Sequence, residues 1–391
     1  MSQPPVGTVA IATIIIFAVS SITHAAFIFG TIVPPDGTII GSDGGVAGGD
    51  FPVFYNAGIM ALKGDAISIW DHTVFQARLL ELFGQPLTGL SFFNPPVALP
   101  IFAPFASMSY LQALWLWTAL PLIMLGWLVY RLSGDLVATA LSLMSPLAIH
   151  NAGAGQTGNL FAVLLVTFLL FDARRPVLAG SVSSLFIVKP HLVPAVPICL
   201  LIDRNWRALA AMVLVSVGLS IAVTVIFGFQ VWSSFFDSVG QHSEELFRSD
   251  VQNYERSLSI VLLLLRLGVD SSIAWAIQVL VSLAALYMLV VVWRAARAPL
   301  YRSFALALAI CLLTPKVHHY DAAILLVPVS ILIAKLMRGT AKLSFVALAI
   351  AIWFLPLLVP VFKIWGFNPG GLLLFAGLIL TFVNSVRSAN G

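Results

Sequence analysis

Long apolar runs recur from one end of the sequence to the other, and they constrain the fold more than any other feature. Residues 343–362 contain no charged side chain, and about 20 apolar residues let a helix cross a bilayer. Of the 391 residues, 60% are hydrophobic and only 9% are charged, whereas about a quarter of an average soluble chain is charged. Because so few charges cannot cover a surface that faces water, the sequence predicts a polytopic integral membrane protein.

Charged, proline and glycine residues divide the sequence into candidate membrane segments. Two of them, 176–189 and 191–203, are shorter than a bilayer crossing requires, so they predict one broken or re-entrant element around Lys189 and Pro190. We expect an all-α fold, a polytopic bundle of about 12 transmembrane helices that forms a single membrane domain over residues 1–391. The segments are 8–30, 109–131, 136–150, 156–172, 176–189, 191–203, 206–228, 272–296, 301–315, 320–337, 343–362 and 368–386.

Lys and Arg are distributed unevenly between the two faces of this bundle. If the N-terminus is cytoplasmic and every segment crosses once, twelve basic residues lie on the cytoplasmic face, seven on the other, and Lys189 between them, which accounts for all 20. Acidic residues show the opposite bias, because only Asp135, Asp172 and Asp203 lie inside. Cytoplasmic loops are enriched in Lys and Arg, so we expect a multi-pass protein of the inner or plasma membrane with both termini in the cytoplasm. The net charge of +4 gives no indication of nucleic-acid binding.

Two long segments, 31–108 and 229–271, do not span the membrane and fall on the outer face in this orientation. The first outer loop holds apolar residues at helical spacing near positions 54–61 and 74–83, which fits interfacial helices in the membrane plane. The alternative is that these helices only fill space beside the bundle. The second outer segment is polar but carries Trp232 and several phenylalanines, again an interfacial composition.

A glycine-rich run, 41–50, lies in the first outer loop and ends at Asp50. The next residues, 51–55, are apolar and lead back toward the membrane, so the carboxylate is expected at the bilayer edge. A carboxylate that is partly removed from water is a stronger base, which suits general-base catalysis. The alternative is that Asp50 only caps the helix that starts beside it.

Polar residues gather in the loop 314–321, which we call the histidine loop. It joins two apolar segments at the outer face and carries Lys316, His318, His319 and Asp321. Ionisable residues at a membrane boundary are costly unless they are solvated or used. Histidine and lysine together supply donors and positive charge for a phosphate group. A solvated connecting loop is the alternative, and a metal site is disfavoured because adjacent histidines point in different directions.

Lys189 lies inside an otherwise apolar run, next to Pro190 and His191. An intramembrane lysine is a functional-site hypothesis by default, and the proline breaks the helix beside it. A lipid phosphate at the outer interface would be a natural counter-ion for this lysine. The alternative is a lysine that extends from a helix end to the interface.

Side-chain amides recur near these segments. Asn94 precedes two prolines at a helix start, Gln156 and Asn159 flank another helix start, and Asn253 lies where the second outer segment returns to the membrane. Together with Tyr55 they are candidates for binding a sugar or an acceptor. Helix capping is the alternative for the first three. The sequence holds no nucleotide-binding, haem or zinc-protease motif, and we expect neither a cofactor nor a metal.

In order along the chain, these motifs resemble glycosyltransferase family 87, whose members are membrane enzymes of the GT-C class. The resemblance covers the chain in patches from residue 50 to residue 320, and the chain departs from the family in having Asn94 where a tyrosine often precedes the two prolines. Lys316 and Val317 between the proline and the histidines are a second departure. The segments that carry the resemblance are 50–58, 61–64, 94–96, 103–105, 113–115, 155–159, 189–190, 314–315 and 318–320.

This resemblance implies transfer of a sugar from a polyprenyl-phosphate donor on the outer, or periplasmic, face of the membrane. Mannose is the typical donor sugar, and the transfer inverts the anomeric centre. An acidic residue of the first outer loop acts as base in the GT-C class, and that position is Asp50 in this sequence. Lys189, His318 and His319 would bind the phosphate of the donor. The acceptor would be a glycolipid or another glycan. Membrane lipids are the other expected partners.

Two alternatives remain open. Some members of the family use arabinofuranose, so the donor could carry that sugar instead of mannose. A non-catalytic transporter of a lipid or sugar would need only the helices and Lys189. Such a transporter is expected to have inverted repeats and a charged path at the midplane, and the sequence shows neither.

Overall fold

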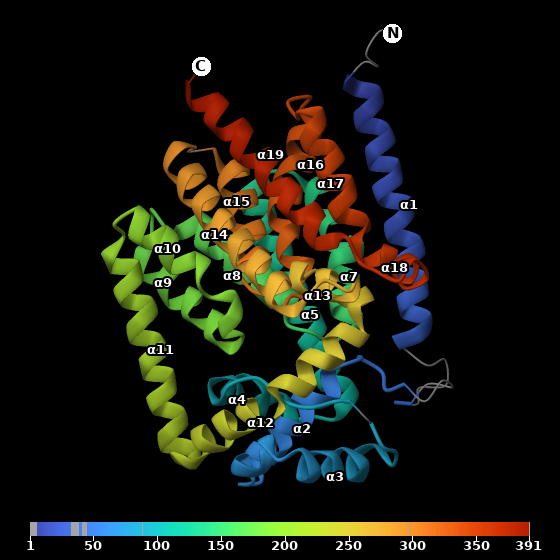
Figure 1. The fold of residues 1–391 in the computed structure, drawn as a ribbon, viewed down its shortest axis with the longest axis vertical. Coiled ribbons are helices and arrows are strands. Elements are labelled where there is room, and N and C mark those ends of the chain that lie inside the picture. The colour runs from blue at the N-terminus through green and yellow to red at the C-terminus, as the bar shows by residue number, and fades with distance from the viewer. Residues whose placement is uncertain (1–5, 33–38, 41–44, 88, 297, 391) are drawn as a thin grey trace.

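The computed structural model describes residues 6–32, 39–40, 45–87, 89–296 and 298–390, and in these residues the fold is helical without a named strand. Both ends of the chain lie at one end of the molecule, and helices of the two outer segments gather at the opposite end (Figure 1). Residues 41–44 of the glycine-rich run lie outside the described residues. The all-α prediction is confirmed.

The bundle between these two ends contains the longest apolar helices. By length and composition, six described helical segments are able to cross a membrane. They are α5 (Tyr110–Ser133), α6 (Leu136–Leu143) with α7 (Pro146–Gly153), α11 (Trp206–Phe227), α14 (Ser271–Ala295), α17 (Leu343–Phe354) with η8 (Leu355–Leu358) and α18 (Val359–Trp365), and most of α19 (Gly370–Asn390). The bundle also contains the long helix α1 (Val6–Ile32). The shorter elements of the bundle include α8 (Gly158–Phe171), α13 (Ile260–Arg266), α15 (Pro299–Leu312), η7 (Asp321–Leu325) and α16 (Leu326–Met337).

Burial differs strongly between helices of this bundle. α15 and α16 are buried along almost their whole length and form its centre. In contrast, Leu214 and Val225 of α11 and Leu280 of α14 are each more than 60% exposed. Apolar side chains turned outward would be unfavourable in water but are at home in hydrocarbon. The exposed apolar surface of these helices fits the predicted membrane bundle.

The predicted break at Lys189 is present, and it forms the tip of a hairpin. Asn205 donates hydrogen bonds of 2.9 and 2.7 Å to the backbone and side-chain oxygens of Asp172, so the two ends of the segment lie together. Irregular backbone at such a tip is tolerated where the surrounding protein satisfies it. The elements of the hairpin are α9 (Pro176–Ser183), η4 (Ser184–Val188), η5 (Pro190–Leu192) and α10 (Ala195–Ile202).

The end of the molecule opposite the termini, which we call the outer end after the predicted orientation, is built from short helices of both outer segments. α2 (Phe51–Leu62) is buried on nearly all sides and packs inside the protein, whereas α3 (His72–Phe83) buries one face and exposes the other. α12 (Gln230–Gln252) is polar and lies across this end (Figure 1). The remaining short elements there are η1 (Ala66–Trp70), η2 (Pro96–Ala98), α4 (Leu99–Phe102), η3 (Ala103–Ser107) and η6 (Tyr254–Arg256).

Candidate active site

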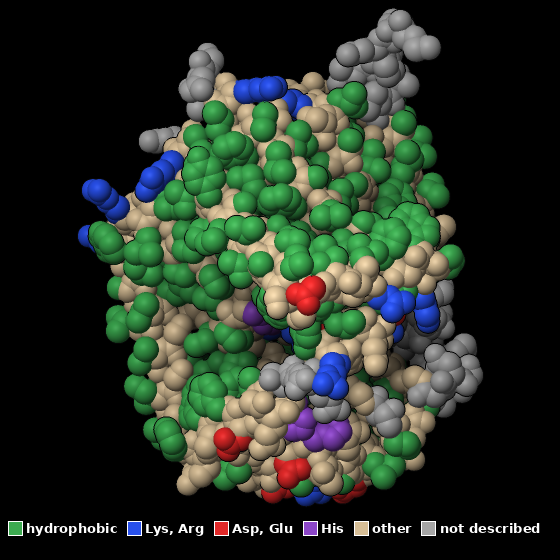
Figure 2. Space-filling view, viewed as in Figure 1, with side chains coloured by type: hydrophobic (Ala, Val, Ile, Leu, Met, Phe, Trp, Pro, Cys, Tyr) green, Lys and Arg blue, Asp and Glu red, His purple; other side chains and the backbone are tan. Residues whose placement is uncertain are grey.

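A cavity of about 620 Å³ lies where the outer-end helices meet the bundle. Figure 2 shows the surface hollowed below its centre, with a histidine side chain inside the hollow. The volume falls in the range of about 300–1,000 Å³ that small-molecule sites occupy. The Asp, Lys and Arg side chains that line it are Asp50, Lys189, Asp250, Arg256, Lys316 and Asp321, and the histidines are His150, His191, His318 and His319.

The first outer loop, the start of α8 and the histidine loop cross at the cavity, and glycines allow their close approach. Gly155 has a φ of +62°, and a Cβ there would lie 2.1 Å from the carbonyl oxygen of Gly48. A Cβ on Gly158, at the start of α8, would lie 2.3 Å from the carbonyl oxygen of Tyr320. Any side chain at either position would push the segments apart. The glycines thus bring the first outer loop, the start of α8 and the histidine loop together.

Asp50 stands at the N-terminal end of α2, but its side chain makes no capping hydrogen bond to that helix. Its backbone amide donates to the carbonyl of Ala154 at 2.9 Å. Its carboxylate accepts a hydrogen bond of 2.7 Å from Nε2 of Gln156 and lines the cavity. The helix-capping alternative for this side chain therefore has no hydrogen bond to support it.

Gln156 links the Asp50 carboxylate to a buried ion pair. Its Oε1 accepts a hydrogen bond of 3.3 Å from Nζ of Lys189, which also contacts Oδ1 of Asp321 at 2.8 Å. The side chains of this pair are only 11% and 4% exposed. A pair so buried depends on further hydrogen bonds, and the backbone amide of His318 donates one of 3.1 Å to Asp321. Asp50 and Lys189 thus lie two hydrogen bonds apart on one wall.

Asp250, near the C-terminal end of α12, contacts two basic side chains of the histidine loop. Its carboxylate lies 3.1 Å from Nζ of Lys316 and 3.2 Å from Nε2 of His318. Burial alone would raise the pKa of Asp250, but these two partners outweigh burial and hold that pKa below its usual value. An ionised Asp250 therefore ties α12 to the mouth of the cavity.

His319 is a buried, neutral imidazole. Its backbone amide and its Nδ1 lie 2.8 and 2.9 Å from the carbonyl oxygen of Arg256. Because a carbonyl only accepts, Nδ1 carries the proton and Nε2 is left as an acceptor. Burial lowers the pKa of His319 to about 4. At neutral pH this side chain supplies shape and an acceptor, but no positive charge.

Most residues selected from the sequence come together in the cavity. Tyr55 and Asn159 are not among the residues that line it. The Tyr55 hydroxyl donates to the carbonyl of Met108, and the Asn159 amide donates to the carbonyl of Ala148 inside the bundle. The selected residues that do line the cavity are Asp50, Asn94, Gln156, Lys189, Asn253, His318 and His319.

Several ionisable residues of the cavity were given no role of their own from the sequence. Lys316 and Asp321 were noted only as members of the histidine loop. Asp250, Arg256 and His150 lie in α12, η6 and α7, where no local pattern separates them from ordinary surface or helix residues. In the described part of the chain, no group of three or more His, Cys, Asp and Glu side chains is placed to hold a metal ion.

The fold and the cavity define a helical membrane protein that gathers a carboxylate, lysines and histidines at one end of an apolar bundle. The chain belongs to glycosyltransferase family 87, because the model of that family matches residues 92–315, which are 224 of the 391 residues. The match includes Gln156, Lys189 and Arg256, while Asp50 and the two histidines of the histidine loop lie outside it. No curated protein and no solved structure gives a match. The protein is a membrane glycosyltransferase.

Proposed function

We propose that the protein transfers mannose from a polyprenyl-phosphate donor to a glycolipid or glycan acceptor on the outer face of the membrane, with inversion. The observation that carries the proposal is one polar cavity in which Gln156 joins the Asp50 carboxylate to Lys189. Sugar transfer from a glycosyl phosphate needs a base that accepts the proton of the acceptor hydroxyl and positive charge that stabilises the leaving phosphate. Both must lie within reach of the bound donor. The alternative donor sugar is arabinofuranose.

In this proposal Asp50 is the general base. The acceptor hydroxyl gives its proton to the carboxylate as its oxygen forms a bond to the anomeric carbon. The bond between that carbon and the phosphate oxygen breaks, and its electron pair leaves with the polyprenyl phosphate. Attack from the side opposite the leaving group converts a β-linked donor sugar into an α-linked product. The hydrogen bond from Gln156 holds the carboxylate in position for this step.

Lys189, His318 and His319 are proposed to surround the phosphate of the donor. Lys189 is fixed at the hairpin tip, and the His318 ring is held by the Asp250 carboxylate. His319 acts as a neutral group that shapes the site. Positive charge that is already in place stabilises the leaving phosphate without rearrangement during the reaction. The remaining amides of the wall, on Asn94 and Asn253, are proposed to contact the sugar or the acceptor.

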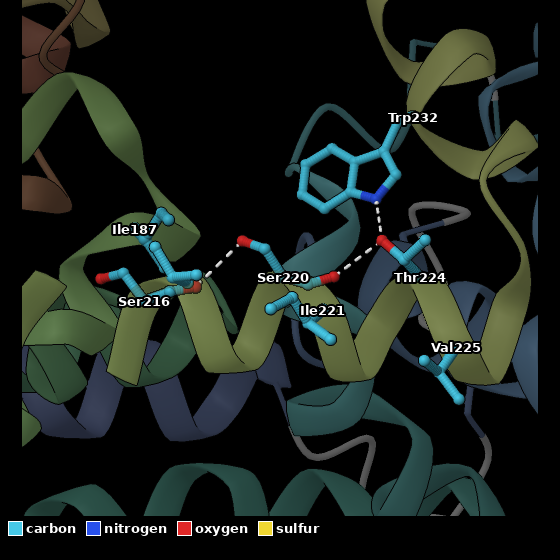
Figure 3. Close-up of a pocket in the computed structure, with 8 residues that line it drawn as sticks. Ile187, Ser216, Ser220, Ile221, Thr224, Val225 and Trp232 are labelled. Atoms are coloured by element: carbon cyan, nitrogen blue, oxygen red, sulfur yellow. Dashed lines mark hydrogen bonds between the residues drawn. The ribbon is translucent and has the colours of Figure 1, made fainter. Parts of the chain in front are cut away.

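An apolar groove beside the cavity supports a lipid-linked donor. It has a volume of about 350 Å³ and lies on α11, against Ile187 of η4 and Trp232 of α12 (Figure 3). Ser220 donates to the helix backbone at 2.9 Å, and the Thr224 hydroxyl both donates to the backbone and accepts from the Trp232 indole, each at 2.8 Å. Because these two hydroxyls and the indole already have hydrogen-bond partners within the protein, the groove suits an apolar chain.

The groove and the cavity are neighbours in the chain. Ile187 lines the groove, and Val188 and Lys189, the next two residues, line the cavity. A donor whose phosphate lies at Lys189 therefore has a path for its isoprenoid chain along α11. The groove lies on α11, whose exposed apolar side chains fit contact with lipid.

The proposed orientation places both termini in the cytoplasm and the cavity on the outer face. In the view of Figure 2, the visible Asp and Glu side chains lie in the lower half of the molecule, whereas Lys and Arg also mark the upper end. The upper end is the end that carries the termini in Figure 1. Enrichment of Lys and Arg on the cytoplasmic face supports this orientation.

The test is a transfer assay with the purified protein in liposomes, with polyprenyl-phosphate donors that carry mannose or arabinofuranose. Asp50→Asn should lower kcat by about 10²- to 10⁴-fold, the usual contribution of a general base, and should leave donor binding intact. The matched control is Asp65→Asn, because Asp65 is a half-exposed carboxylate of the same outer segment that does not line the cavity. It should keep full activity.

Four results of this assay would contradict parts of the proposal. Full activity of Asp50→Asn would remove Asp50 as the base. A wild-type protein that uses neither donor would reject the class of donor. Transfer only to acceptors enclosed on the cytoplasmic side of sealed, oriented vesicles would reverse the proposed orientation, and movement of intact donor across the bilayer without turnover would favour the transporter.

A further inference from the structure

The charges of the cavity wall pair with one another, with two exceptions. Two ion pairs account for four of the six charged side chains, Lys189 with Asp321 and Lys316 with Asp250. Asp50 and Arg256 are left, and within the described residues neither has an ion-pair partner. Asp50 is bonded to a neutral amide and serves as the proposed base. Arg256 is the cation of the wall whose charge no carboxylate offsets.

The backbone holds Arg256 beside the histidine loop. The amide of Leu258 donates to the carbonyl of Val317 at 2.8 Å, and the amide of His319 donates to the carbonyl of Arg256 at the same distance. Ser257 and His318 face each other in an isolated antiparallel bridge. The residue before Arg256 is anchored as well, because Asn368 donates to its carbonyl at 2.9 Å. The Arg256 backbone is therefore fixed, while its side chain is exposed and lines the cavity.

The charge balance of the wall depends on this arginine. Counted without the histidines, the six charged side chains are three cations and three carboxylates, so their sum is zero. Without Arg256 the same wall would hold two cations and three carboxylates, a net charge of −1, which opposes the entry of an anion. A guanidinium also offers two parallel donors that match the oxygens of a phosphate, which a lysine ammonium does not.

We propose that Arg256 binds the phosphate group of the lipid-linked donor and holds it as it becomes the leaving group. Lys189 and Lys316 then share their charge between this phosphate and the carboxylates that already bind them. The ligand in this inference rests on the proposed function. Recognition by Arg256, however, requires only that the ligand be a polyprenyl phosphate, whether or not a sugar is attached.

Binding without catalysis tests this role. The probes are polyprenyl phosphate and the polyprenol of equal chain length, titrated against the full-length protein in nanodiscs and followed by tryptophan fluorescence. Arg256→Gln should weaken binding of polyprenyl phosphate by about 10- to 100-fold, the usual loss of a charge-assisted hydrogen bond, and should leave polyprenol binding unchanged. Lys63→Gln is the control, because it removes an exposed cation of the outer end that does not line the cavity.

Arg256→Lys separates charge from geometry and also serves if the glutamine variant does not fold. It keeps the charge but loses the paired donors, so its affinity for polyprenyl phosphate should lie between those of the wild type and Arg256→Gln. The inference would be overturned if both variants bound polyprenyl phosphate with wild-type affinity. If only the lysine variant folds, wild-type affinity in that variant would have the same meaning. Either result would count even where sugar transfer is demonstrated. Loss of phosphate binding in these variants, in a protein that transfers no sugar, would support Arg256 and contradict the proposed function.

Discussion

Lys189 is both a member of a buried ion pair with Asp321 and a residue proposed to bind the donor phosphate. The two residues are 132 positions apart in the sequence, and their side chains form an ion pair of 2.8 Å in the cavity wall. Removing one member of a buried pair leaves the other charge without compensation, which costs more than removing both. We therefore expect a change at Lys189 to affect stability as well as the proposed donor binding, and the two effects must be measured apart.

The pair predicts a specific pattern in three variants. Lys189→Met and Asp321→Asn should each lower the free energy of unfolding by about 3–5 kcal/mol, because a single buried charge remains. The double variant should recover most of that loss but should not recover sugar transfer, because the cation at the phosphate is gone. Equilibrium unfolding in detergent and the transfer assay check the two parts. A double variant as unstable as the single ones would show that the ion pair does not account for the loss.

Sequence reasoning at this scale identified Lys189 but not its partner. An intramembrane lysine stands out because few residues around it are polar. Its partner cannot be read from spacing, because the contact depends on how the hairpin and the histidine loop pack. The same limit applies to Asp50, for which helix capping and catalysis were both open. In the structure the Asp50 side chain makes no capping hydrogen bond and instead accepts one from Gln156, 106 positions away.

At the scale of elements, α11 combines an outer apolar surface with the groove beside the cavity. Long apolar runs without proline were predicted well, since the expected segments 206–228 and 272–296 correspond to α11 and α14 within one residue at each end. The segment 136–150 was predicted as one helix, but it is divided into α6 and α7. The reason is local, because Ser145 caps a new helix that starts with Pro146.

Filling the groove on α11 should affect long-chain donors selectively. Ser220→Phe puts a ring into the groove, whereas Leu214→Phe on the same helix adds bulk at an exposed position outside it. We expect the first variant to raise KM for a long polyprenyl-phosphate donor, with little change for a donor of one or two isoprene units, because only the long chain reaches the groove. The control should match the wild type. An equal rise in KM for both chain lengths would place the isoprenoid chain elsewhere.

At the scale of the whole molecule, composition and the long apolar runs together predicted an all-helical membrane bundle, because a chain with 9% charged residues cannot cover a surface that faces water. The ordered motifs predicted the family. The cavity needed the structure, because Asp50, Lys189 and the histidine loop come from distant segments that meet through crossings at Gly155 and Gly158. Asp250 and Arg256 could not be predicted from the sequence, because their places in the cavity wall follow from contacts that no local pattern encodes.

The most direct measurement of the central claim is an experimental structure of the protein with a non-cleavable phosphonate analogue of the donor. The account predicts the sugar in the cavity, with its anomeric carbon between the Asp50 carboxylate and a phosphonate that contacts Lys189 and Arg256, and with the isoprenoid chain along α11. A headgroup bound outside this cavity, or an anomeric carbon beyond reach of an acceptor held at Asp50, would contradict it.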